Sequence, residues 1–151
     1  MIKIKDLSIS FSGKDLFTDV NIHLNPKEKI GLIGRNGAGK STFLNLLLGR
    51  IEPDTGEVEL ARNYQIGFLE QHIKFSNPTI IEEVTSILPE ERIYEAWKGE
   101  KILNGLGFSE SEILQDPNLF SGGYQVKINL AKLLLLEPNL LLLDEPTNYL
   151  D

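Results

Sequence analysis

Residues 34–41 read Gly-Arg-Asn-Gly-Ala-Gly-Lys-Ser, a glycine-rich stretch that fits the pattern G-x-x-x-x-G-K-[ST]. Glycine is needed there because a side chain would keep phosphate away from bare backbone amides. The apolar segment 29–33 precedes the stretch, and leucines at helical spacing follow it in residues 41–48. The sequence therefore predicts a strand, a phosphate-binding loop and a helix, in that order, with Gly49 ending the helix.

The residues of this loop have predicted roles in holding a nucleoside triphosphate with magnesium. The amide groups at the start of the helix point at the anion, and Lys40 neutralises its β- and γ-phosphates. The Ser41 hydroxyl is a predicted magnesium ligand. The nucleotide-binding residues predicted from this stretch are Gly34, Asn36, Gly37, Ala38, Gly39, Lys40, Ser41 and Thr42.

The composition is that of an ordinary folded domain. The 151 residues are 41% hydrophobic and 25% charged, which is enough for one domain with an apolar core. The absence of cysteine excludes disulfides and thiolate chemistry and suits a reducing cytoplasm. The longest apolar run, residues 133–143, is interrupted at 137–139 and is too short to span a bilayer. We therefore expect a soluble, cytoplasmic protein with no direct membrane insertion.

The net charge of −7 is unevenly distributed along the chain. Residues 1–75 carry 10 Lys+Arg and 9 Asp+Glu, whereas residues 76–151 carry 5 and 13. This acidic second half argues against a broad electrostatic grip on nucleic acid, although a local basic patch stays open.

The rest of the pattern predicts strands on both sides of a helical middle. Residues 79–106 and 126–136 have helical spacing, and Pro89 breaks the first of these segments. Further strands are predicted at 2–9, 20–24, 58–60, 66–68 and 140–143, of which 58–60 and 66–68 are expected to form a hairpin. The all-apolar segment 140–143 is typical of a buried strand in a parallel sheet.

Two acidic residues follow that buried strand. A strand that delivers a carboxylate at its carboxyl end often supports phosphate-bound magnesium. We therefore predict that Asp144 lies in the magnesium shell and that Glu145 orients and deprotonates the attacking water. Ser121, Gly122 and Gly123 begin a helix and offer a second anion site. Taken alone, an ordinary helix N-cap is the simpler explanation of Ser121.

Together, in their order and spacing, these three stretches resemble the ATP-binding cassette (ABC) family over residues 2–151. The resemblance implies an α/β P-loop NTPase fold of the ABC ATPase type, with ATP and Mg2+ as cofactors. Residues 34–42 resemble the Walker A loop, 121–123 the signature motif, and 140–145 Walker B.

The same resemblance assigns several further residues. Gln71 matches the glutamine that contacts magnesium and senses the γ-phosphate, and residues 150–151 match the D-loop. Phe11 matches the aromatic position that stacks on adenine, with a core residue at a strand end as the alternative. Neither His23 nor His72 matches the family's switch histidine, and we expect both to be structural.

The resemblance also implies a domain organisation and a partner. Residues 1–75 and 137–151 would form the ATP-binding subdomain, and residues 76–136 the helical subdomain. In the family two cassettes sandwich each ATP, so residues 121–123 would serve a nucleotide held mainly by a second cassette. Because the family continues beyond the D-loop, we expect a C-terminally incomplete piece of a longer two-cassette protein. Such a piece should hydrolyse ATP weakly or not at all, and its exposed sheet edges favour self-association.

Residues 145–151 resemble the E-P-T-N-H-L-D stretch of the F subfamily, with Tyr149 in place of histidine. Members of that subfamily have no membrane domain, and many act on the ribosome in translation, so the ribosome is the implied partner. Two alternatives stay open: the ATPase subunit of a transporter with a membrane permease, and a fragment that binds nucleotide without turnover. The chain departs from the family at Phe120 and Tyr124, and it leaves little room for the subfamily's helical arm between Gln71 and Ser121.

Overall fold

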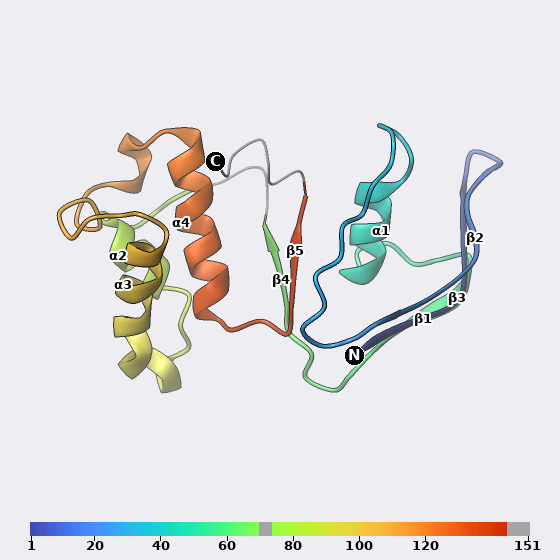
Figure 1. Ribbon diagram of the computed structural model, residues 1–151, viewed down its shortest axis with the longest axis horizontal. Helices are drawn as coiled ribbons and strands as arrows, with labels where there is room; N and C mark the ends of the chain where they lie inside the picture. The colour runs from blue at the N-terminus through green and yellow to red at the C-terminus, as the bar shows by residue number, and fades with distance from the viewer. Residues whose placement is uncertain (70–73, 145–151) are drawn as a thin grey trace. The chain divides into compact units, whose positions relative to one another are not determined.

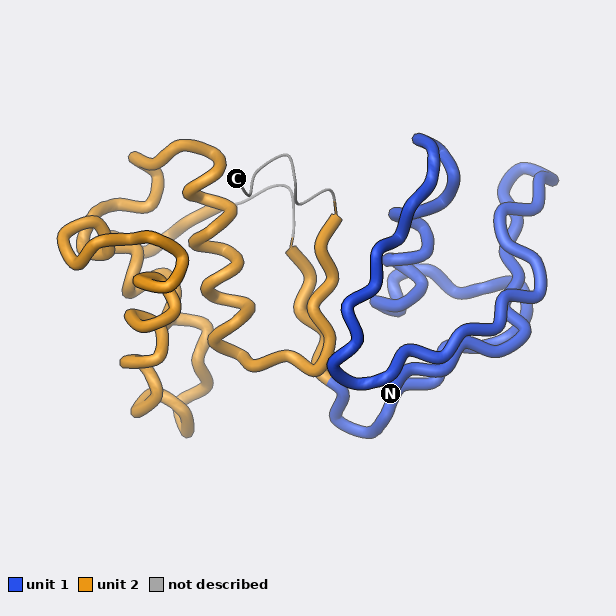
Figure 2. The backbone as a smooth tube through the Cα atoms, viewed as in Figure 1, with its two compact units in different colours: residues 1–64 blue, residues 65–151 orange. Residues whose placement is uncertain are grey.

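The computed structural model describes residues 1–69 and 74–144 and divides the chain into two compact units, Met1–Tyr64 and Gln65–Asp151 (Figures 1 and 2). The first unit contains a three-stranded sheet and one helix. The second contains a two-stranded sheet with three helices and two 3₁₀ turns. Along the described ranges no helix is both long and apolar enough to cross a membrane.

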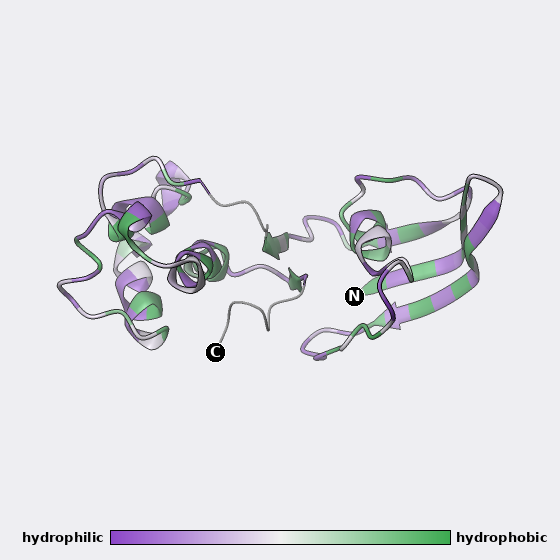
Figure 3. Cartoon of the chain, turned by 90° about the horizontal axis from the view of Figure 1, so that it is seen from above, coloured by the Kyte–Doolittle hydropathy of each residue, from purple (hydrophilic) through white to green (hydrophobic). Residues whose placement is uncertain are grey.

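The first unit is built on an antiparallel sheet in the order β2–β1–β3. Its strands are β1 (Ile2–Phe11), β2 (Lys14–Leu24) and β3 (Thr55–Leu60). Hydrophobic and hydrophilic residues alternate along these strands, as Figure 3 shows, and β1 buries Ile2, Ile4, Leu7 and Ile9. The alternation shifts by one residue at Asp6, whose φ of 46° marks a bulge. The predicted strands at 2–9 and 20–24 are thus confirmed.

A two-residue turn joins β1 to β2. Phe11 pairs with Lys14, and the residues between them, Ser12 and Gly13, have φ values of 51° and 75°. Positive φ at both central positions is the mark of a type I′ turn, which matches the twist of a hairpin. The hairpin is therefore specified locally by the sequence Ser-Gly.

Helix α1 (Lys40–Leu47) confirms the helix predicted after the glycine-rich loop. It buries Leu44, Leu46 and Leu47. The Gly49 amide donates to Leu46 O at 3.1 Å, and the Arg50 amide donates to Asn45 O at 2.9 Å. These are the two bonds of a Schellman motif, with Gly49 at the left-handed position (φ 66°) as predicted.

The predicted strand at residues 29–33 is wrong: this segment has no regular secondary structure. Its large side chains are exposed, Ile33 to 95% and Ile30 to 63%. A buried strand is stabilised by hydrogen-bonded neighbours, and none of the described strands pairs with these residues. An apolar run alone does not provide the partners.

The second unit confirms the helical middle of the chain. Thr79 caps α2 (Ile80–Thr85), and Pro89 begins the 3₁₀ turn η1 (Glu90–Glu95), which continues into α3 (Ala96–Gly105). A second turn, η2 (Pro117–Leu119), leads to α4 (Gly122–Leu135). The last helix begins four residues earlier than the apolar pattern predicts, because its first turn is polar and rich in glycine.

The strand β4 (Ile66–Leu69) pairs in parallel with β5 (Leu140–Leu143), from Ile66–Leu140 to Leu69–Leu143. The parallel pairing confirms the prediction from the apolar segment 140–143. It also corrects the predicted hairpin of 58–60 with 66–68, because β3 pairs with β1 instead. The hairpin was predicted because the two segments are close in the sequence. In the structure β4 pairs instead with β5, which is distant in the chain.

Helix α4 packs against two apolar clusters. Ile128, Ala131 and Leu135 join the core formed with α2 and α3, which includes Ile80 and Leu103. On another part of its surface, Val126 and Leu130 contact Leu69 of β4. Full burial of one such side chain contributes about 1.5–3 kcal/mol, so α4 holds this unit together.

One buried carboxylate is part of the same helical core. Glu83 is 2% exposed and forms an ion pair with Lys132 of α4. Its second oxygen accepts hydrogen bonds from the backbone amides of Ser76 and Asn77 and from the Asn77 side chain. Burial raises the pKa of Glu83, but the bonds from Lys132, Asn77 and Ser76 outweigh it and lower the pKa to about 2.

Replacing Gly56 should destabilise the first unit. Its φ is 78°, and a Cβ there would lie 2.3 Å from the carbonyl oxygen of Lys5 and 2.4 Å from that of Asp6. We expect Gly56→Ala to lower the free energy of unfolding by roughly 2–4 kcal/mol in urea denaturation. The control is Gly13→Ala, since Gly13 also has positive φ but no atom within 4 Å of its Cβ. The free energy of unfolding of the control should fall by only about 1–2 kcal/mol. Equal decreases in the two variants would contradict the steric argument.

The Glu83 carboxylate should make the free energy of unfolding depend on pH in the acidic range. Its folded pKa is below the ordinary 4.5, so its contribution is complete above pH 4.5 and is lost as the pH falls towards 2. We expect Glu83→Gln to be less stable than the wild type by roughly 2 kcal/mol at pH 7, because the half-buried ammonium of Lys132 loses its charged partner. Urea titrations should show this difference shrinking from pH 4.5 downwards. The exposed Glu110, replaced by Gln, is the control; a difference constant with pH would refute the assignment.

Candidate functional site

The glycine-rich loop in the first unit folds as a turn. The Ala38 amide donates to Arg35 O at 3.1 Å, and Gly37 occupies the third position of the turn with φ of 81°. A type II turn requires positive φ at that position, which glycine adopts without strain. Asn36 occupies the second position of this turn. All residues from Gly34 to Ala38 are exposed.

Gly39 immediately precedes α1 and cannot be replaced without movement. Its φ is 92°, and a Cβ would lie 2.9 Å from Cζ of Phe17 and 3.0 Å from Cδ2 of Leu16. The Phe17 ring also packs edge-on against Phe43 of α1, with 6.0 Å between ring centroids. The β2 strand therefore presses on the start of α1 and fixes where the loop meets the helix.

Lys40 extends back over this loop. Its Nζ donates to Gly34 O at 2.9 Å and to Arg35 O at 3.2 Å. The ammonium group is thereby held against the start of the loop, at the carbonyls of Gly34 and Arg35. Ser41 and Thr42 follow in the first turn of α1.

The N-termini of two helices lack side-chain caps. Gly39 and Ser121 precede α1 and α4, and neither of these N-cap residues makes a side-chain hydrogen bond to its helix. By contrast, the Thr79 side chain accepts the Glu82 amide and caps α2. Ser121 occupies the N-cap position of α4 with an extended backbone, but its side chain makes no capping hydrogen bond. Uncapped first-turn amides are the groups that bind anions at helix starts.

An aromatic cluster holds the start of α4. The rings of Phe120 and Tyr124, on either side of residues 121–123, pack on Phe108 with centroid distances of 6.0 and 5.3 Å. Gln125 Nε2 donates to Phe120 O at 3.0 Å. Phe120 and Tyr124, the two residues that depart from the family signature, therefore belong to the same aromatic cluster. Sequence reasoning treated them separately because nothing in the local pattern links them to Phe108.

The other predicted site residues fall at strand ends or outside the described residues. Phe11 is the last residue of β1 and is 48% exposed, so it is not a core residue. Asp144 directly follows β5 and is half-buried, and His23 lies on β2. The predictions for Gln71, Glu145, His72 and the D-loop at 150–151 lie outside residues 1–69 and 74–144.

The structure thus gathers the predicted residues in two groups. The first unit contains Phe11 and the loop from Gly34 to Thr42. The second contains residues 121–123 and Asp144, which lie at opposite ends of one helix–loop–strand segment. No cluster of three or more His, Cys, Asp or Glu occurs in the described part of the chain.

Comparison with known proteins identifies the family and the fold. The family model for ABC transporter matches residues 17–148. The uncharacterized ABC transporter ATP-binding protein YfmM of Bacillus subtilis is 35% identical over 192 aligned residues, covering 100% of this chain and 37% of that protein. ABC transporter F family member 5 of Arabidopsis thaliana is 31% identical, covering 99% of this chain and 28% of that protein.

Solved structures match as well. The dimeric structure of MJ0796, a bacterial ABC transporter cassette, has a TM-score of 0.76 and 25% identity, covering 100% of this chain and 76% of that chain. The fold is therefore that of an ABC ATPase cassette, a P-loop NTPase. This chain belongs to the ABC transporter family, and its relatives include an F family member. The chain spans about a third of the length of the curated relatives compared.

Proposed function

We propose that this chain binds ATP with magnesium as one ABC cassette. The observation that carries the proposal is a loop in which Gly37 and Gly39 have positive φ and Lys40 donates back to the loop carbonyls, directly before the start of α1, where Gly39 provides no side-chain cap. Amides, a helix N-terminus and an ammonium group together suit a triphosphate. Phe11, half exposed at the end of β1, would stack on the adenine ring.

The residues that would hold magnesium are Ser41, Gln71 and Asp144. A hydroxyl, an amide oxygen and a carboxylate are all oxygen ligands, which Mg2+ prefers. Bound magnesium would neutralise charge on the phosphates. Glu145 would orient a water for in-line attack on the γ-phosphate and accept its proton, while Lys40 stabilises the phosphate charge.

A second cassette would complete the site. The first amides of α4 and the Ser121 hydroxyl are not used for capping, so they suit a phosphate brought by another molecule or domain. The MJ0796 cassette was solved as a dimer. We therefore propose that residues 121–123 contact ATP held by a partner cassette, either in the same longer protein or in a second copy. Hydrolysis belongs to that paired state.

The cellular role that we favour is that of the F subfamily, with the ribosome as partner in the cytoplasm. It rests on residues 145–151 and on the similarity to an F family member. The match with YfmM runs over 192 residues against 151 here, so that relative carries residues without a counterpart in this chain. The transporter alternative remains, because structures such as MJ0796 are transporter cassettes.

Lys40 should decide whether the loop binds ATP. We expect Lys40→Met to weaken magnesium–ATP binding at least about tenfold in isothermal titration, since the β- and γ-phosphates lose their ammonium partner. The fold should survive, because among the described residues the Lys40 ammonium donates only to the loop carbonyls of Gly34 and Arg35. The control is Lys29→Met, an exposed lysine just before the loop. Equal affinities for both variants would contradict the proposal.

Ribosome association tests the cellular role. The protein that contains this chain should co-sediment with ribosomes in the presence of ATP when Glu145→Gln blocks turnover, because hydrolysis would no longer release it. A Lys40→Met/Glu145→Gln variant is the control and should stay in the supernatant. Absence of co-sedimentation in every nucleotide state would exclude the ribosomal role and favour the transporter alternative.

A further inference from the structure

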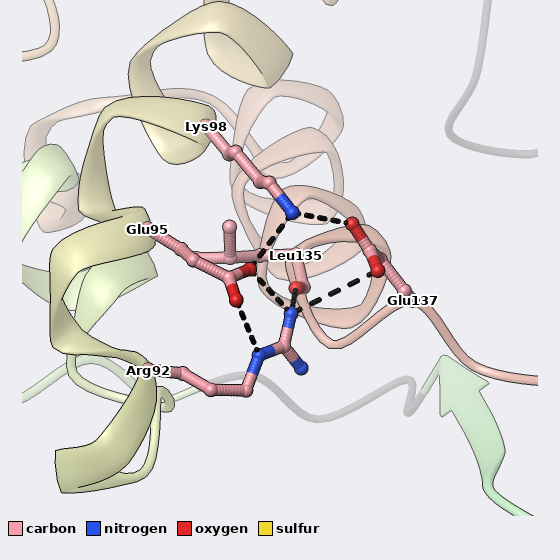
Figure 4. Close-up of polar contacts among 5 residues, drawn as sticks. All are labelled: Arg92, Glu95, Lys98, Leu135 and Glu137. Carbon is pink, nitrogen blue, oxygen red and sulfur yellow. Dashed lines mark hydrogen bonds and ion pairs between the residues drawn. The ribbon is translucent and has the colours of Figure 1, made fainter.

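Four charged side chains form a closed ring where α3 meets the end of α4. Arg92 donates to Glu95 through two nitrogens, at 3.1 and 2.7 Å. Lys98 Nζ lies 2.8 Å from Glu95 and 2.9 Å from Glu137, and Arg92 Nη2 lies 3.9 Å from Glu137 (Figure 4). Two cations alternate with two carboxylates, so each charge has opposite charges as neighbours. The ring links η1 and α3 to the connection between α4 and β5.

Glu137 occupies a backbone position that normally favours glycine. It follows the C-cap residue Leu136 and has φ of 54°. Glycine is the usual residue there, and another L-residue costs about 1–2 kcal/mol. A glutamate at such a position indicates that its side chain has a role, and the contacts to Lys98 and Arg92 provide it.

Pro138 changes how this helix ends. The Glu137 amide donates to Leu134 O at 3.0 Å, which is one bond of a Schellman motif. The second bond would come from residue 138, but proline has no N–H. At the same helix end, Arg92 Nη2 donates to the carbonyl of Leu135 at 3.5 Å. The two cations of the ring also lie at the negative end of the α4 dipole.

The other side of the connection is fixed to β4. Asn139 exchanges backbone and side-chain bonds with Gln65: its amide donates to Gln65 O at 2.9 Å, and its Oδ1 accepts the Gln65 amide at 2.8 Å. Pro138 packs on Gly67, where an added Cβ would lie 3.2 Å from the proline Cγ. The four-residue connection 136–139 is thus held between α3 on one side and β4 on the other.

We propose that Glu137 is a positioning residue that, through this ring, fixes the direction of β5 and hence the place of Asp144 at its end. The inference rests on the proposed role of Asp144 in magnesium–ATP binding. Only four residues of strand separate the connection from that carboxylate. A change in direction at Glu137 therefore displaces Asp144 while leaving the phosphate loop of the first unit untouched.

The test compares ATP affinity with and without magnesium. A fluorescent ATP analogue is titrated into the chain, once with Mg2+ and once with EDTA. Glu137→Gly suits the backbone but opens the ring. We expect it to reduce the ratio of the ATP affinity with Mg2+ to that with EDTA by roughly tenfold. Magnesium-free affinity should change by less than about twofold. Glu137→Gln should regain much of the loss, because its amide oxygen still accepts from Lys98.

Matched variants separate positioning from stability. Glu100→Gln, an exposed acid on α3, should behave like the wild type. If Glu137→Gly does not fold, Lys98→Gln opens the ring without touching the backbone of the connection and should show the same selective loss. The proposal is overturned if the increase in ATP affinity on adding Mg2+ stays within about twofold of the wild-type value. It is also overturned if the affinities with and without Mg2+ fall together.

A wild-type chain that binds no ATP would contradict the proposed function rather than the ring. Hydrogen exchange then tests the ring directly. Exchange at the amides of Leu140–Leu143 should be faster in Glu137→Gly than in the wild type and Glu100→Gln, because β5 has lost its anchor. Unchanged exchange there would overturn the inference.

Discussion

Burial of α4 against two apolar clusters is the interaction on which the second unit depends. Ile128, Ala131 and Leu135 fill the core shared with α2 and α3, and Val126 and Leu130 meet β4. Because one helix serves both clusters, the helical layer and the parallel strands cannot separate without exposing apolar surface to water. The amides at the start of α4 and the strand that follows its end are consequently parts of one packed body.

The candidate site lies where local rules of stability are broken. The starts of α1 and α4 have no side-chain caps, and Gly37 and Gly39 take backbone conformations that other residues avoid. A missing cap costs about 1 kcal/mol, and the core offsets it. Elsewhere the same chain caps its helix well, with Thr79 on α2 and Gly49 at the end of α1. The uncapped amides are therefore a local exception that suits an anionic ligand.

Charge is used differently in the interior and at the site. The buried Glu83 pairs with the half-buried Lys132 and is supported by backbone amides, and Glu95 joins a ring whose charges alternate. The hydrogen bonds from Arg92 and Lys98 lower the pKa of Glu95 to about 2, so it stays ionised under ordinary conditions. These acids are held by fixed partners, whereas the Lys40 ammonium, within residues 1–69 and 74–144, donates to carbonyl oxygens of its own loop. A lysine bonded to neutral oxygens has charge to offer a phosphate.

Local patterns in the sequence determined the phosphate loop, α1 with its glycine end, the broken helical middle and the apolar strand 140–143. They succeeded there because neighbouring residues decide backbone conformation and helix ends. Only the tertiary structure decided which strands pair: β3 joins β1, β4 joins β5, and residues 29–33 form no strand. It also joined Phe120 and Tyr124 to Phe108, and Glu137 to Arg92 and Lys98. Such contacts depend on burial and charge between residues far apart in the chain, which no local pattern records.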